Sequence, residues 1–254
     1  MAWERGGREW RLADICAACA GATSHAAVVP DTALHSPPAD VPPAPRRTPG
    51  GLTVEIRVRE MLSYLAAVLP TEATAATRLL ALQCALRSTR SGEVRIPTGL
   101  VRGMRLGADT VPHQALESAG WLCLQGLRPD SCRQGLTGRL LDPTVCTQAP
   151  GRRSRARAAG WALRVCGARQ LRPLGTAPRL LALVLDAHST AGSAHEAVDR
   201  DVLGRLSGLA PPQLPQVLDL LVDAQFLQSW TFEATSGDVR WALPSPKPLA
   251  HDEL

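Results

Sequence analysis

The sequence predicts a mainly α-helical fold with small β-hairpins, arranged as two similar units. Apolar residues recur at helical spacing through most of the chain after residue 51. The run RLLAL at 78–82 returns at 179–183, and the same offset of 101 residues relates Gly103 to Gly204 and Gly107 to Gly208. Each copy then ends in a short apolar strand. We interpret this as a duplication, with a chance match of abundant Leu and Ala as the alternative.

The first 51 residues form a separate part of the chain. Residues 1–35 are an N-terminal segment in which Cys16 and Cys19, followed by His25 and His35, have ligand types and spacing suited to a structural zinc ion. In the alternative, the two cysteines lie on the apolar face of a short helix and pack as small hydrophobic residues. Residues 36–51 are rich in proline and predict a linker.

The first unit covers residues 52–149. A leading helix is expected at Glu55–Leu69, where apolar residues are spaced by three and four, and Pro70 ends it. The elements expected after it are helix Thr77–Arg87, strand Glu93–Ile96, helix Pro97–Met104, helix Asp109–Ser118, and strands Trp121–Leu127 and Leu136–Leu141 around a tip at Arg128–Gly135.

The second unit covers residues 150–248 and precedes a short tail at 249–254. Its leading helix is expected at Ala156–Gln170, by the offset of 101 residues. The expected elements after it are a buried helix that starts at Arg179, helices Ala197–Leu206 and Pro211–Ala224, and a hairpin of Phe226–Phe232 with Val239–Leu243.

A hairpin directly after three helices resembles the winged helix-turn-helix superfamily, and here the arrangement occurs twice in tandem. The resemblance implies double-stranded DNA as the partner, the third helix of a unit in the recognition position, and the hairpin as a wing. It places several arginines of the first unit on parts that face phosphates in the superfamily: Arg90, Arg95, Arg102, Arg105, Arg128, Arg133 and Arg139.

The charge distribution predicts which half would meet DNA. The net charge is +5, but residues 84–175 carry fifteen arginines and five acidic residues, whereas 176–254 carry five basic and ten acidic residues. A polyanion is attracted to the first half and repelled by the second. Between the units, Arg152, Arg153, Arg155 and Arg157 could contact phosphates or a minor groove. A solvated helix start is the alternative.

The expected third helices carry few groups that read bases. In the first unit, His113 and Gln114 are the candidate base readers, while Asp109 and Glu117 oppose phosphates. The third helix of the second unit has no basic residue, so we expect it to meet protein. An apolar flank of Leu214, Val217 and Leu218, expected to be exposed there, suggests a homodimer or another protein partner.

Several other classes of protein are disfavoured. Phosphate-loop, dinucleotide and hydrolase motifs are absent, and the run HEAVD at 195–199 lacks the second histidine of a zinc protease. We therefore expect no enzyme and no cofactor besides the candidate zinc. We also expect a cytoplasmic protein without a membrane partner, because no segment suits a membrane span or signal peptide. A near-exclusive use of Arg over Lys and the absence of Asn favour a GC-rich, actinobacterial source.

The sequence thus predicts a DNA-binding protein, most simply a transcriptional regulator that uses the first unit and the arginine-rich start of the second. Two alternatives stay open. Tandem winged helices also serve as protein-interaction scaffolds, and the pair resembles the kleisin-binding subunit of condensin-like complexes. Plasmid replication initiators also use paired winged helices.

Overall fold

The computed structural model describes residues 53–104, 106, 111–124, 135–147, 151–190 and 196–244, together with the strand residues 2–5, 9–12 and 26–27. The chain divides into two compact units, Met1–Pro49 and Gly50–Leu254. In the first unit, β1 (Ala2–Arg5), β2 (Glu9–Leu12) and β3 (Ala26–Ala27) form an antiparallel sheet in the order β2-β1-β3. These strands were not predicted. The zinc candidates Cys16, Cys19, His25 and His35 and the proline-rich linker lie outside the described residues.

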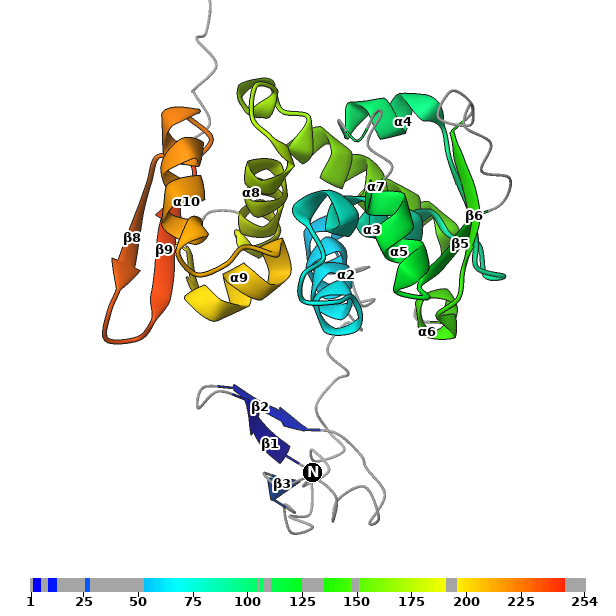
Figure 1. Ribbon diagram of the computed structural model, residues 1–254. Coiled ribbons are helices and arrows are strands. Elements are labelled where there is room, and N and C mark those ends of the chain that lie inside the picture. Colours follow the sequence, from blue (N-terminus) through cyan, green and yellow to red (C-terminus); the bar gives the residue numbers. More distant parts are fainter. Residues whose placement is uncertain are drawn as a thin grey trace, which may run out of the picture. The chain divides into compact units, whose positions relative to one another are not determined.

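The unit Gly50–Leu254 contains one succession of elements twice (Figure 1). The first repeat, residues 53–147, consists of α2 (Val54–Val68), α3 (Ala75–Arg87), β4 (Glu93–Ile96), α4 (Thr98–Gly103), α5 (Val111–Ser118), β5 (Leu122–Leu124), β6 (Leu136–Leu140) and α6 (Pro143–Thr147). The second repeat, residues 151–244, consists of α7 (Arg152–Cys166), a 3-10 helix (Arg169–Leu171), α8 (Thr176–His188), β7 (Glu196–Asp199), α9 (Arg200–Ser207), α10 (Gln213–Asp223), β8 (Ser229–Glu233) and β9 (Asp238–Ala242).

Both repeats form an antiparallel sheet of the same topology. The strand orders are β4-β6-β5 and β7-β9-β8, so in each repeat the last strand pairs with both earlier ones. The first strand of each sheet follows a long helix, and two shorter helices separate it from the closing hairpin. The prediction of a mainly helical chain with small β-sheets is confirmed. Among the helices that the structure describes, none is long and apolar enough to cross a membrane.

A buried arginine occupies the same place in each repeat. The Nε of Arg78 donates a hydrogen bond to the carbonyl oxygen of Ala73 at 3.1 Å, and the Nε of Arg179 donates to that of Leu174, also five residues earlier, at 3.1 Å. Both side chains are buried, and these hydrogen bonds satisfy the Nε group of each. The arginine of the RLLAL run therefore has the same structural role in both repeats. It connects the first turn of its helix to the preceding loop by a hydrogen bond.

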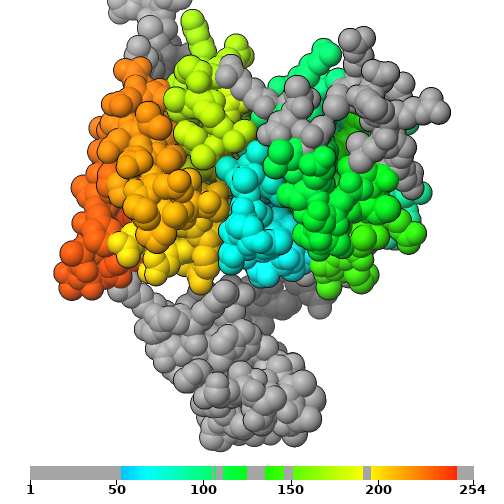
Figure 2. Space-filling view, viewed as in Figure 1, coloured from blue at the N-terminus to red at the C-terminus, as the bar shows by residue number. Residues whose placement is uncertain are grey.

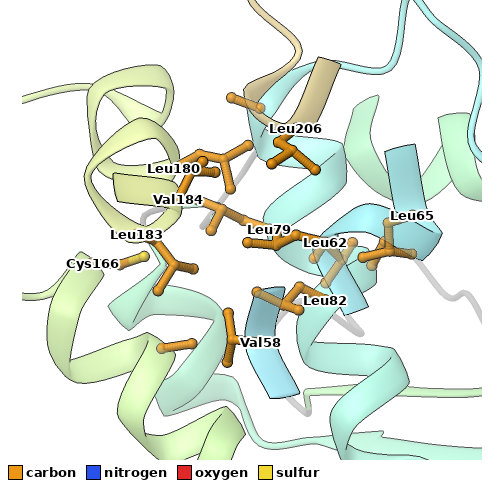
Figure 3. Packing of buried hydrophobic residues seen from close by; sticks show 14 of the residues in the cluster. Val58, Leu62, Leu65, Leu79, Leu82, Cys166, Leu180, Leu183, Val184 and Leu206 are labelled. Carbon is orange, nitrogen blue, oxygen red and sulfur yellow. The ribbon is translucent and has the colours of Figure 1, made fainter. Parts of the chain in front are cut away.

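The two repeats share one hydrophobic core. Helix α2 packs against α7 and α8 of the second repeat as well as against α3, and α7 packs in turn against α3. Figure 3 shows Val58 and Leu62 of α2, Leu82 of α3 and Leu183 of α8 pointing toward one another. The central helices α2, α3, α7 and α8 thus bury the apolar faces of both repeats in one continuous cluster.

The predicted helix Ala197–Leu206 is wrong at its beginning. Residues Glu196–Asp199 are strand β7, which pairs with β9, and α9 begins only at Arg200. The carboxylate of Asp199 accepts hydrogen bonds from the backbone N–H groups of Asp201 and Val202, at 2.9 and 3.1 Å. Such an N-cap fixes where a helix can begin. With β7, the second repeat has a strand that corresponds to β4 of the first repeat. The sequence predicted such a strand in the first repeat only.

Other boundaries also differ from the predictions, most of all those of α7 and β8. Helix α7 begins at Arg152 instead of Ala156 and ends at Cys166, so the arginine-rich stretch is helical. The predicted strand from Phe226 begins at Ser229. Before it, Gln225 has a φ of 58°, and the N–H groups of Phe226 and Leu227 both donate to the carbonyl of Leu221. These residues therefore close the C-terminus of α10 before the strand can start.

Candidate nucleic-acid interface

The outer face of the first sheet carries two of the arginines singled out from the sequence. Along β4 and β6, alternate residues are buried and exposed, which leaves Arg95 and Arg139 on the solvent side. In the antiparallel register Arg95 is paired with Thr137, and Glu93 is paired with Arg139. The two guanidinium groups are therefore diagonal neighbours on one face. Val94, Ile96, Leu136 and Leu140 face the core and hold this face in place.

Two more arginines of the first repeat are exposed. Arg90 lies in the turn between α3 and β4, and Arg102 lies in the last turn of α4. Within the described part of the chain, Arg90, Arg95, Arg102 and Arg139 form no ion pair, whereas Arg240 of the second repeat pairs with Glu233 at 2.7 Å. These four arginines of the first repeat thus offer positive charge that the carboxylates of the described residues leave unpaired. Arg105, Arg128 and Arg133 lie outside the described residues.

The arginines at the start of α7 divide between surface and core. Arg152, Arg153 and Arg157 are exposed on its first two turns. Arg155 is only 4% exposed, and its guanidinium donates a hydrogen bond to the hydroxyl of Ser88 at 3.2 Å. The prediction that Arg155 contacts phosphates is therefore wrong, because its side chain is buried and joins α7 to the end of α3. A helical period of 3.6 places one member of this closely spaced group on the inward side.

Helix α5 occupies the position of the third helix in the first repeat. Its buried residues are Pro112 and Leu116, and Gln114 is exposed, while His113 is half-buried. The sequence interpretation overlooked Val111, whose side chain is 56% exposed on this helix. An exposed apolar residue carries no signal in a hydrophobicity pattern, which assigns valine to the core.

The acidic residues on the two third helices have a structural role. The carboxylate of Glu117 on α5 accepts a hydrogen bond from the backbone N–H of Leu124 at 3.0 Å. At the corresponding place on α10, the carboxylate of Asp219 accepts one from the indole N–H of Trp230 at 2.9 Å. Each acid joins a third helix to the strand that follows it. From the sequence, Glu117 is expected only to oppose phosphates, and its hydrogen bond with the backbone of Leu124 could not be predicted.

The apolar residues of α10 are not an exposed flank. Leu214 is 1% exposed, Val217 8% and Leu218 0%, because all three pack into the shared core. The expectation of an exposed apolar flank is wrong, and the proposed homodimer loses the observation that motivated it. The exposed residues of α10 are instead mostly polar or acidic, with two apolar exceptions, Pro215 and Leu220: Gln213, Pro215, Gln216, Asp219, Leu220 and Asp223.

The two repeats thus present different surfaces from one framework. Figure 2 shows α2 in cyan, with the gold and orange helices α9 and α10 on one side of it and the green, later part of the first repeat on the other. Unpaired arginines lie on the first repeat and on α7, and polar or acidic residues lie on α10. No protein-family model matches the sequence, and comparisons with curated proteins and with solved structures give no match.

Proposed function

We propose that the chain is a tandem winged-helix protein that binds double-stranded DNA and acts as a transcriptional regulator. The proposal is carried by the element order, because helix, strand, two helices and a two-stranded hairpin occur in both repeats with the same strand order. That order is the one expected of a winged helix, in which the second and third helices form the helix-turn-helix. In the first repeat these are α4 and α5.

The surface proposed for DNA comprises the first repeat and the beginning of α7. Arg90, Arg95, Arg102 and Arg139 are exposed without an ion pair among the described residues, and Arg152, Arg153 and Arg157 extend the positive charge onto α7. Arginine contacts to phosphates position a protein on DNA and release condensed counterions. Residues 84–175, with fifteen arginines against five acidic residues, supply the charge for this mode of binding.

The test compares matched pairs of arginine substitutions. We expect Arg152→Ala with Arg153→Ala to weaken binding to duplex DNA of any sequence and to lower the slope of log affinity against log salt by about one unit per lost contact. The control is Arg200→Ala with Arg205→Ala, a pair that is also exposed on α9 but lies among acidic residues. Fluorescence anisotropy with a labelled duplex at several salt concentrations measures both quantities.

A protein-interaction scaffold is the second candidate function. It is favoured by α10, which exposes Asp223 and Leu220, the latter 43% exposed, and carries no basic residue. If no duplex binds even at low salt, the DNA-binding proposal fails and the scaffold takes its place. If both arginine pairs weaken binding equally, the assignment of DNA to the first repeat is wrong.

A further inference from the structure

Helix α5 exposes one stripe of side chains. Val111, Gln114 and Ser118 are exposed, and their spacing of three and four residues places them on one face of the helix. Pro112 and Leu116 on the opposite side are buried. The stripe therefore faces away from the core along the length of α5.

The other polar residues of α5 are unsuited to reading bases. His113 is half-buried, and the carboxylate of Glu117 is held by the backbone of Leu124. The helix contains no arginine or lysine, so it cannot make the bidentate contact that identifies guanine. The chemistry of the exposed stripe is thus limited to one amide, one hydroxyl and one isopropyl group.

From this stripe we infer that α5 reads A·T base pairs in the major groove, with the Gln114 amide on adenine and the Val111 methyl groups against the thymine methyl. This inference rests on the proposed function. The glutamine amide can donate to N7 and accept from the N6 amino group of adenine, and a thymine methyl favours an apolar neighbour. The unpaired arginines of the first repeat supply the charge complementarity that a duplex requires.

Helix α10 provides a matched control. A shift of 102 residues places Gln216 at the position of Gln114, and Gln213 and Leu220 at the positions of Val111 and Ser118. Gln216 is exposed on a third helix like Gln114. It lies on the half of the chain that carries ten acidic and five basic residues after residue 175, which repels phosphates. A reader of bases at this position would lack the charge needed to approach DNA.

The experiment uses a pool of duplexes with a randomised core and the full-length chain. Sequencing of the bound fraction is expected to reveal neighbouring A·T pairs at fixed positions. One selected duplex is then remade with 7-deazaadenine, which lacks N7, or with uracil, which lacks the thymine methyl. We expect each analogue to weaken wild-type binding, the former by roughly tenfold, the discrimination typical of one bidentate contact.

The variants identify the residues responsible. Gln114→Ala should bind the 7-deazaadenine duplex as well as the ordinary one, Val111→Ala should become indifferent to uracil, and Gln216→Ala should behave like the wild type. Salt-dependent binding without A·T enrichment, or equal analogue effects in wild type and Gln114→Ala, overturns the inference and leaves the proposed function standing. The absence of any DNA binding overturns both.

Discussion

The arginines at the start of α7 show that one residue type can lie on the surface or in the core according to its position on a helix. Four arginines lie within six residues at the start of α7, and one of them is buried against Ser88. A count of charge cannot separate these roles, whereas the helical period can once the first residue of the helix is known. The sequence could predict the positive charge of this region. It could not predict that Arg155 faces the core, because the start of the helix was predicted four residues too late, at Ala156 instead of Arg152.

Gly208 follows α9 and offers a direct test of the contact between the repeats. Its φ is 69°, and a Cβ at this position would lie 2.7 Å from the Nε of Arg78 and 2.9 Å from the carbonyl oxygen of Ala73. We expect Gly208→Ala to lower the free energy of unfolding by about 1–3 kcal/mol, because both the backbone strain and the crowding are unfavourable. The midpoint and slope of urea denaturation measure the loss.

Gly103 serves as the control for this substitution. It is exposed at the end of α4, and a Cβ there meets no atom within 4 Å. Because alanine is a better helix former than glycine, Gly103→Ala should leave stability unchanged or raise it by up to about 1 kcal/mol. A Gly208→Ala protein as stable as the wild type would show that the close approach to Arg78 does not constrain this residue.

His188, the last residue of α8, predicts a pH dependence. Burial, with a smaller effect from nearby Arg59, lowers the pKa of His188 below its ordinary value of 6.5, and its Nδ1 donates to the carbonyl of Val184 at 2.7 Å. The unfolded state therefore binds a proton more readily than the folded state. This contribution to stability is full above pH 6.5 and is lost as the pH falls through the lowered folded-state pKa.

The measurement compares wild type with His188→Gln, which does not titrate. From pH 8 down to about pH 5, the free energy of unfolding of the wild type should fall relative to that of the variant. Asp186, whose pKa is raised by burial and by Glu55, has the opposite dependence at lower pH, but its contribution is common to both proteins. A constant difference between the two proteins over this range would contradict the prediction.

Among the elements, strand β7 is the most important one that the sequence did not predict, because residues 197–199 were assigned to a helix. The helix and strand at 75–96 were predicted closely because Pro97 and the turn at Gly92 mark their ends. Residues 196–199 carry no such marker, and alternation over four residues is too short to distinguish from the first turn of an amphipathic helix. The pairing of β7 with β9, about forty residues later, makes these residues a strand. Such a long-range contact cannot be recognised from the local sequence.

The N-cap at Asp199 should decide the boundary between β7 and α9. Removal of its carboxylate in Asp199→Ala leaves the N–H groups of Asp201 and Val202 without their acceptor. We expect a loss of about 0.5–2 kcal/mol in the free energy of unfolding. Asp223→Ala makes the same chemical change at the C-terminal end of α10, where an acid opposes the helix dipole, and should be neutral or slightly stabilising. Equal effects of both substitutions on thermal denaturation would argue against a capping role.

At the scale of the whole molecule, the shared core predicts cooperative unfolding. Leu183 of α8 is fully buried in the cluster that also contains Val58 and Leu82 of the first repeat. We expect Leu183→Ala to cost about 2–5 kcal/mol. If the repeats unfold together, native-state hydrogen exchange should show the same loss of protection for β6 in the first repeat as for β9 in the second. Protection of β6 that is unchanged by the substitution would show that the repeats open independently.

The packing of helices of one repeat against those of the other affects how the sequences of the two repeats can diverge. Helix α2 packs on α8 while α7 packs on α3, an arrangement that two identical chains could also make by symmetry. In a symmetric dimer every substitution appears twice, so a carboxylate that suits one side is imposed on the other. A covalently joined pair is released from this rule, and each half can diverge alone. The arginines of one half and the acids of the other are such a divergence within one fused framework.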